Sequence, residues 1–358
     1  MEKRPSYLDS GLGNLVAEIE LKLTGESPTP GLRQSSLAPA AATFVLVLFD
    51  GLGVAQLEHA AASSFRATHV ADLDAPFPTM TNVSLATVAT ALSPAQHGQV
   101  AHLAWYPDLE MVVNTLKWVT LGGQPVTYDY AGLLPRPNLW ERLRSAGIEP
   151  ITVQPADFQT SPLTREMYRG ARFEGAWDPA DLANATLALA AEPGRFIFTY
   201  VPFVDYAGHV FGQGSTEFAD AMTLAATIWE TILAGLPPGA AAVGTADHGL
   251  LEVSESDKIL IRDPQFDRLR KAGDPRGVQL WGDEALIADL ESLTGGSIVD
   301  PVSLLGPGLT DVARSRLGER LLLAPPGKVV LPRGFDRRLR CYHGGLSPEE
   351  LAIPLLVG

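Results

Sequence analysis

Three apolar segments of strand length, each followed closely by an acidic residue, constrain the fold more than any other feature. They span residues 43–49, 195–201 and 240–246, and the acids that follow are Asp50, Asp205 and Asp247. Unbroken apolar runs of this length are typical of parallel strands buried on both faces. Helical patterns at residues 138–147, 181–191 and 218–233 lie between or beside them. This alternation predicts an α/β fold with its site at the carboxyl ends of the strands.

A hydroxyl side chain stands at the start of another helical pattern. Pro76 and Pro78 keep the entry extended, and small and apolar residues then follow at helical spacing until Pro94. Thr81 therefore lies where a loop becomes the first turn of a helix, where free N–H groups and the helix dipole favour an anion. Threonine at such a position is ordinarily an N-cap. We nevertheless take Thr81 as the candidate nucleophile because of the residues described next.

Carboxylates and imidazoles near the strand ends form a candidate metal site. The candidates are Asp50, Asp205, His209, Asp247, His248 and His343. The Asp-x-x-x-His pair would face one way on a helical turn, and the adjacent Asp-His pair at a strand tip would reach in two directions. Such ligands suit two zinc-like ions. Metal coordination would activate a threonine hydroxyl, and two metals would stabilise the attacking and leaving oxygens of an in-line displacement.

The net charge of the chain limits the kinds of molecule that it can bind. The chain of 358 residues carries a formal net charge of −14, which argues against binding to nucleic acid polymers or anionic membranes. A small phosphorylated substrate remains compatible, because bound metal ions reverse the local field. Cys341 is the single cysteine, so an intrachain disulfide is excluded. The first residues lack the apolar core of a signal peptide, and we expect a cytoplasmic protein.

The chain divides into a short N-terminal part and a large domain. Residues 1–36 are predicted to hold an amphipathic helix and a Pro-, Gly- and Ser-rich linker. Residues 37–358 would form the catalytic domain. Two stretches fit the strand–helix alternation poorly, about 103–130 with its hairpin pattern and about 254–340 with mixed charge and many prolines. We interpret both as cap insertions over the strand ends.

Six short motifs resemble those of the type I phosphodiesterase/nucleotide pyrophosphatase family of the alkaline phosphatase superfamily. They occur in the family's order from about Phe44 to the C-terminus. They read here as Phe49-Asp50-Gly51, Phe77-Pro78-Thr79-Met80-Thr81, Pro94-Ala95-Gln96-His97-Gly98, Asp205 with His209, Asp247-His248-Gly249 and His343-Gly344. The resemblance implies an alkaline-phosphatase-like three-layer sandwich with a mostly parallel central sheet and cap insertions.

The resemblance also implies roles for these residues. One metal would be held by Asp50, Asp247, His248 and the Thr81 oxygen, and the other by Asp205, His209 and His343. The ions would be zinc, given the histidine-rich ligand set, with manganese as the alternative. The implied activity is hydrolysis of phosphodiester or pyrophosphate bonds in nucleotide-type substrates, through a phosphothreonine intermediate on Thr81.

Two departures from the family pattern concern the substrate. Relatives carry an asparagine that donates to the phosphoryl group, and that slot is His102 here, 102 − 81 = 21 residues after Thr81. Val83-Ser84 replaces the relatives' Pro-Asn. Arg165 is a candidate clamp for extra phosphate charge. The alternative interpretation is that Arg165 is a surface residue beside a helix without a functional role.

Other functions remain open at this point. A phosphomonoesterase or a phosphosugar mutase of the same superfamily would use a similar site. A sulfatase needs a cysteine or serine near the nucleophile, where this chain has threonine. A non-catalytic metal-binding protein would have no use for a nucleophile beside six ligands.

Overall fold

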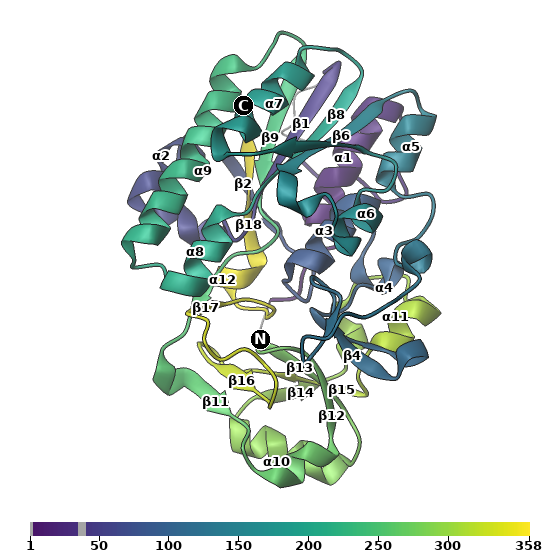
Figure 1. Cartoon of the computed structure of the whole chain (residues 1–358), viewed down its shortest axis with the longest axis vertical. Helices are drawn as coiled ribbons and strands as arrows, with labels where there is room; N and C mark the ends of the chain where they lie inside the picture. Colours follow the sequence, from purple (N-terminus) through teal and green to yellow (C-terminus); the bar gives the residue numbers. More distant parts are fainter. Residues whose placement is uncertain (1–2, 35–40) are drawn as a thin grey trace.

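The computed structural model describes residues 3–34 and 41–358. Its central sheet has seven strands in the order β2-β18-β9-β1-β8-β6-β7 (Figure 1). Their bounds are His69–Asp74, Ala352–Val357, Ala240–Thr245, Thr43–Phe49, Arg195–Val201, Glu149–Pro155 and Arg172–Ala176. Strands β9, β1, β8, β6 and β7 are mutually parallel, and β18 alone runs against its neighbours. The sheet is therefore mixed but mostly parallel, as the sequence predicts.

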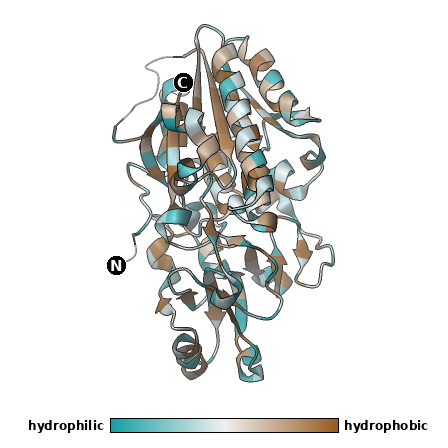
Figure 2. Ribbon diagram, turned by 90° about the vertical axis from the view of Figure 1, so that its left-hand side faces the viewer, coloured by the Kyte–Doolittle hydropathy of each residue, from teal (hydrophilic) through white to brown (hydrophobic). Residues whose placement is uncertain are grey.

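Two groups of helices cover this sheet and complete a three-layer sandwich. One group comprises α1 (Leu12–Thr24), α3 (Thr81–Thr90), α5 (Leu139–Ser145) and α6 (Pro162–Met167), and the other α2 (Ser63–Thr68), α7 (Pro179–Ala190), α8 (Phe203–Phe211) and α9 (Thr216–Gly235). The strands between them are largely hydrophobic (Figure 2), and β1 is buried along its whole length. Burial on both faces explains why these strands lack the polar alternation of a one-sided sheet.

The cap is a second seven-stranded sheet, built from two distant parts of the chain. Its order is β14-β15-β13-β12-β3-β4-β5, and its paired strands are antiparallel. The bounds are Ser297–Val299, Arg320–Leu323, Gly277–Trp281, Arg270–Asp274, Leu103–Tyr106, Met111–Asn114 and Val119–Thr120. Helices α10 (Glu284–Thr294) and α11 (Asp311–Arg316) belong to the same region. The two stretches that break the strand–helix alternation thus share one sheet, below the central sheet in Figure 1.

Short elements link the two sheets. Strand β10 (Leu251–Glu252) pairs with β17 (Cys341–Tyr342), and β11 (Lys258–Leu260) pairs with β16 (Val329–Leu331). Helices α4 (Pro94–His97) and α12 (Pro348–Leu351) complete the connections. In the part of the chain that the structure describes, no helix is both long and apolar enough to cross a bilayer.

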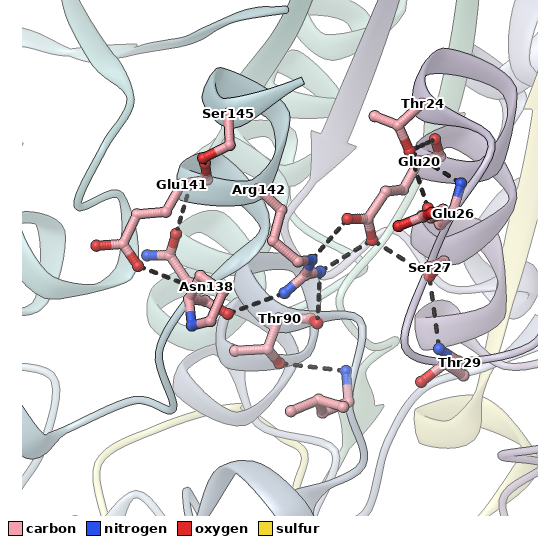
Figure 3. A network of polar contacts seen from close by, with 12 residues as sticks. Glu20, Thr24, Glu26, Ser27, Thr29, Thr90, Asn138, Glu141, Arg142 and Ser145 are labelled. Atoms are coloured by element: carbon pink, nitrogen blue, oxygen red, sulfur yellow. Dashed lines mark hydrogen bonds and ion pairs between the residues drawn. The ribbon is translucent and has the colours of Figure 1, made fainter. Parts of the chain in front are cut away.

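A buried ion pair attaches the N-terminal helix to the rest of the domain. Arg142 of α5 donates from Nε and Nη2 to the Glu20 carboxylate of α1, over 2.6 and 2.9 Å, and from Nη2 to the carbonyl of Thr90 over 3.1 Å (Figure 3). The Glu20 side chain is only 2% exposed. Because Thr90 is the last residue of α3, this guanidinium also caps that helix, where a cation is favourable. The predicted boundary between residues 36 and 37 lies outside the described residues.

Candidate metal and nucleophile site

Parallel strands bring the predicted site residues to one edge of the central sheet. Asp50 directly follows β1, and Asp247 and His248 follow its neighbour β9. Asp205 and His209 lie on α8, which begins two residues after β8 on the other side of β1. This edge faces the cap (Figure 1). Side chains separated by up to about 200 residues therefore meet because of strand order alone.

The first cluster contains Asp50, Asp247, His248 and Thr81. Nε2 of His248 lies 3.2 Å from Oδ2 of Asp247, 3.6 Å from Oδ1 of Asp50 and 3.1 Å from the Thr81 hydroxyl. All four residues are buried. Thr81 is the first residue of α3, so its hydroxyl reaches this cluster from the start of a ten-residue helix.

The second cluster contains Asp205, His209 and His343. Nε2 of His209 lies 3.2 Å from Oδ1 of Asp205 and 3.1 Å from Nε2 of His343, which is itself 3.6 Å from the same carboxylate oxygen. The ring of His343 stacks on that of His248 with centroids 3.6 Å apart, so the clusters adjoin. Each cluster has the composition of a metal site.

Three carboxylate oxygens in these clusters show that the donor sets fit cations. Oδ1 of Asp50, Oδ2 of Asp247 and Oδ1 of Asp205 are buried and have no hydrogen-bond partner among residues 3–34 and 41–358. These same atoms point at the imidazoles. Donors held about 2.0–2.1 Å from a tetrahedral zinc ion lie about 3.3 Å apart, close to the spacings given above. A bound cation would satisfy all three oxygens.

Backbone carbonyl groups fix the orientation of the three imidazoles. The Nδ1 atoms of His209, His343 and His248 lie 2.7, 2.8 and 3.1 Å from carbonyl oxygens. A carbonyl oxygen can only accept, so each Nδ1 carries the hydrogen and each Nε2 presents a lone pair. Nε2 of His209 and Nε2 of His343 then face each other without a hydrogen between them. A cation held by both Nε2 atoms would remove this repulsion.

The pKa shifts of the site residues also favour cation binding. Burial, followed by the charges of Asp247 and Asp205, raises the pKa of Asp50 well above its ordinary value, and a hydrogen bond from the Tyr200 hydroxyl opposes this. Burial, followed by the neighbouring imidazoles, lowers the pKa of His343 well below its ordinary value. Neutral imidazoles are the form that binds metal, and crowded carboxylates ionise together only beside positive charge.

Three other hydroxyl side chains lie near Thr81 in the sequence and could be mistaken for the nucleophile: those of Thr79, Ser84 and Thr87. Thr79 bonds with Gly344 and Gly345, Ser84 donates to the carbonyl of Asp247 over 2.7 Å, and Thr87 lies 3.1 Å from a ring nitrogen of His97. Each of these hydroxyls therefore has a hydrogen-bond partner other than the ligand atoms of the two clusters; Ser84 bonds to the backbone of Asp247, not to its carboxylate. The Thr81 hydroxyl has a ring nitrogen of the first cluster as its neighbour.

The structure separates the two predicted substrate-binding residues. His102 directly precedes the cap strand β3. Burial is the main reason that its pKa falls to about 4, and the nearby side chains of His209 and Lys117 lower the pKa further. Its Nδ1 is buried and has no partner within the described parts of the chain. His102 is therefore neutral at neutral pH, and its cationic form is unavailable. Arg165 is exposed on α6, and among the described residues its side chain has no ion pair with either cluster.

Sequence reasoning missed two polar groups next to the site. Tyr200 donates its hydroxyl hydrogen to Asp50 from within β8. A tyrosine one residue before the end of an otherwise apolar strand is a signal that could have found it. Asp274 ends cap strand β12 and is 1% exposed. Nothing in the local sequence distinguishes it from a surface aspartate at a turn.

Comparison with known proteins identifies relatives of this fold. No curated protein sequence matches the chain. Phosphonoacetate hydrolase from Sinorhizobium meliloti 1021 superposes with a TM-score of 0.66 at 19% identity, covering 87% of this chain and 89% of that one. Murine ectonucleotide pyrophosphatase/phosphodiesterase 5 superposes with a TM-score of 0.64 at 17% identity, covering 87% of each chain.

A family model gives the closer assignment. The model of type I phosphodiesterase/nucleotide pyrophosphatase matches residues 44–283, which contain β1, Thr81, α8 and the Asp247-His248 pair. The match spans 240 of 358 residues (283 − 44 + 1), two thirds of the sequence. The chain therefore belongs to the type I phosphodiesterase/nucleotide pyrophosphatase family of hydrolytic enzymes.

Proposed function

We propose that the protein is a two-metal phosphoesterase that hydrolyses phosphodiester or pyrophosphate bonds of small nucleotide-type substrates through a phosphothreonine intermediate. The observation that carries this proposal is the Thr81 hydroxyl, 3.1 Å from Nε2 of His248 in a cluster whose carboxylates lack partners in the described chain. The family match supports the reaction class. A related murine protein has been solved as an inactive threonine-to-alanine variant in complex with AMP.

In this proposal Asp50, Asp247, His248 and Thr81 hold one metal, and Asp205, His209 and His343 hold the other. When bound, the two ions would supply positive charge for the phosphoryl oxygens and would lower the pKa of an oxygen nucleophile. Their four positive charges exceed the three aspartate charges, 4 − 3 = +1, so an anionic substrate is attracted within an acidic protein. Three histidines in the clusters favour zinc, and manganese is the alternative.

The chain's own groups perform the bond changes at Thr81. Its oxygen bonds to phosphorus while the bond to the leaving oxygen breaks; the hydroxyl proton passes to solvent, and the leaving oxygen takes up a proton from solvent. Water then attacks phosphorus on the opposite side, the phosphorus–Thr81 bond breaks, and the threonine oxygen regains a proton. The start of α3 directs backbone N–H groups at the same region and favours the phosphoryl anion.

His102 is proposed as a neutral donor to a non-bridging phosphoryl oxygen, in the slot where relatives carry asparagine. Arg165 is proposed as a clamp for extra phosphate charge on the substrate, since it is exposed and unpaired within the described residues. A cytoplasmic location is part of the proposal and is supported by the buried free thiol of Cys341, which suits a reducing compartment.

The test uses purified protein loaded with zinc or, in parallel, with manganese. Turnover is measured on bis(p-nitrophenyl) phosphate, p-nitrophenyl phosphate and p-nitrophenyl sulfate, and on a nucleoside triphosphate. We expect the diester and the triphosphate to be preferred, and Thr81→Ala to be inactive on both. Preference for the monoester, or activity retained in Thr81→Ala, would show that the proposal is wrong.

A further inference from the structure

The segment that carries His343 is bonded at three points to one buried residue, Thr79. The carbonyl of Thr79 accepts from Nδ1 of His343 over 2.8 Å. Its hydroxyl accepts from the backbone N–H of Gly344 over 2.9 Å and donates to the carbonyl of Gly345 over 3.0 Å. Thr79 is fully buried. One side chain and its own carbonyl thus hold the ring and the next two peptide groups of this segment.

The same segment is tied to the cap by a buried ion pair. The N–H of Gly345 donates to Glu350 over 2.8 Å, and Glu350 accepts from Nε and Nη2 of Arg276 over about 3 Å. Arg276 lies in the turn between cap strands β12 and β13, and its Nη1 donates to the carbonyl of Pro325 over 3.0 Å. The side chains of the pair are 3% and 0% exposed. A buried ion pair with all these hydrogen bonds is rigid, so it fixes the position of Gly345 relative to the turn of the cap.

Close packing around Gly344 and Gly345 leaves no room for a different backbone conformation. Gly344 has φ +118°, and a Cβ there would lie 3.0 Å from Cβ of Asp274 and 3.1 Å from Sδ of Met80. A Cβ on Gly345 would lie 2.7 Å from Glu350. Because glycine alone fits both positions, the hydrogen bonds of Thr79 and Glu350 act on a segment already confined by its neighbours.

We propose that the Thr79 hydroxyl and the Arg276–Glu350 pair are positioning groups for His343, through which the cap sets the metal affinity of the cluster of Asp205, His209 and His343. This inference rests on the two-metal site of the proposed function. Groups that orient a metal-binding histidine typically change metal affinity about 10- to 100-fold when removed. The first cluster draws no ligand from this segment and meets it through the stacking of His343 on His248, so its affinity should change much less.

The experiment titrates zinc into full-length, metal-depleted protein against a chromogenic chelator, without substrate. Wild type is expected to bind two zinc ions. Thr79→Val, which keeps the shape and removes the hydroxyl, should weaken one of them about 10- to 100-fold and affect the other much less. Thr79→Ser should bind like wild type, and Glu350→Gln should weaken the same ion as Thr79→Val.

Thr90→Val is the matched control, because the buried Thr90 hydroxyl bonds only within its own helix and the turn after it, away from His343. It should bind both ions normally.

Melting temperatures confirm that the variants fold. If Thr79→Val does not fold, the zinc affinity of Glu350→Gln tests the inference in its place. Normal affinity for both ions in the folded variants, equal weakening of both, or a wild type that binds fewer than two would overturn the inference. A protein that binds two ions but hydrolyses none of the test substrates would refute the proposed function and leave this inference standing.

Discussion

We predict that Asp274 makes the stability of the metal-free protein fall as the pH rises. Its side chain is 1% exposed, and Oδ2 has no hydrogen-bond partner in the described residues. Burial raises the pKa of this carboxyl from 3.8 to about 8, against a smaller lowering by the backbone N–H of His102. Between these values the folded protein holds a proton that the unfolded chain has released. Stability is therefore greatest at low pH in this window and declines toward pH 8.

The magnitude of this effect follows from the pKa of about 8 for Asp274. Each pH unit well inside the window is worth about 1.4 kcal/mol, so the step from pH 6 to pH 7.5 removes about 2 kcal/mol from this group alone. A chain of 358 residues has an unfolding entropy of about 0.75 kcal/mol/K. The expected contribution to the melting temperature is therefore about 2.5 °C.

Asp274→Asn tests this value, because asparagine keeps the size and the acceptor of the carboxyl but does not titrate. Melting temperatures of chelated wild type and variant are recorded at pH 6 and pH 7.5. The difference, variant minus wild type, should grow by about 2.5 °C between the two pH values, and the other titrating groups cancel in this comparison. An offset that is the same at both pH values would show that Asp274 is not protonated in the folded protein.

Three further predictions follow from the site and its supports. Thr81→Ala should bind two zinc ions, keep its melting temperature and lose nearly all turnover; loss of a zinc ion as well would mean that lost metal, and not a lost nucleophile, explains the inactivity. His102→Ala should lower turnover about 10²–10³-fold and His102→Asn should restore much of it. Because its pKa is about 4, the pH–rate profile of wild type should show no inflection from His102 between pH 6 and 8. Arg142→Met should cost about 3 kcal/mol by leaving Glu20 buried and unpaired, measured by denaturant unfolding, and Glu20→Leu in the same chain should recover much of that loss.

The clustering of many candidate site residues at one edge of the sheet could be predicted because these residues follow strongly apolar strands; their roles stay predictions. The positions of Asp50 and Asp247 follow from strand order, and His209 follows from its spacing on a helical turn. His343 was predictable only through the family motif, since no strand pattern precedes it. The sequence also predicts the mostly parallel sheet and the two inserted stretches.

The remaining features depend on contacts between distant residues. Strand β18 contains Pro354, which argues against a strand inside a sheet. It is tolerated because β18 pairs with β9 only through Leu356 and Val357. The hydrogen bonds of Thr79 to Gly344 and Gly345 span about 265 residues. Local pattern carries no information about such contacts.

The cap sheet has a consequence for how the chain folds as it is synthesised. Strand β3 and its hairpin partner β4 are complete by residue 114, but β12 begins only at Arg270, and the two parts pair through Leu103 and Gly273. At 5–20 residues per second, about 10–30 s separate their synthesis. During that interval one edge of β3 is an unpaired strand edge, which is prone to associate with other chains. The interval should make the nascent hairpin a preferred binding site for chaperones until the later cap strands have been synthesised.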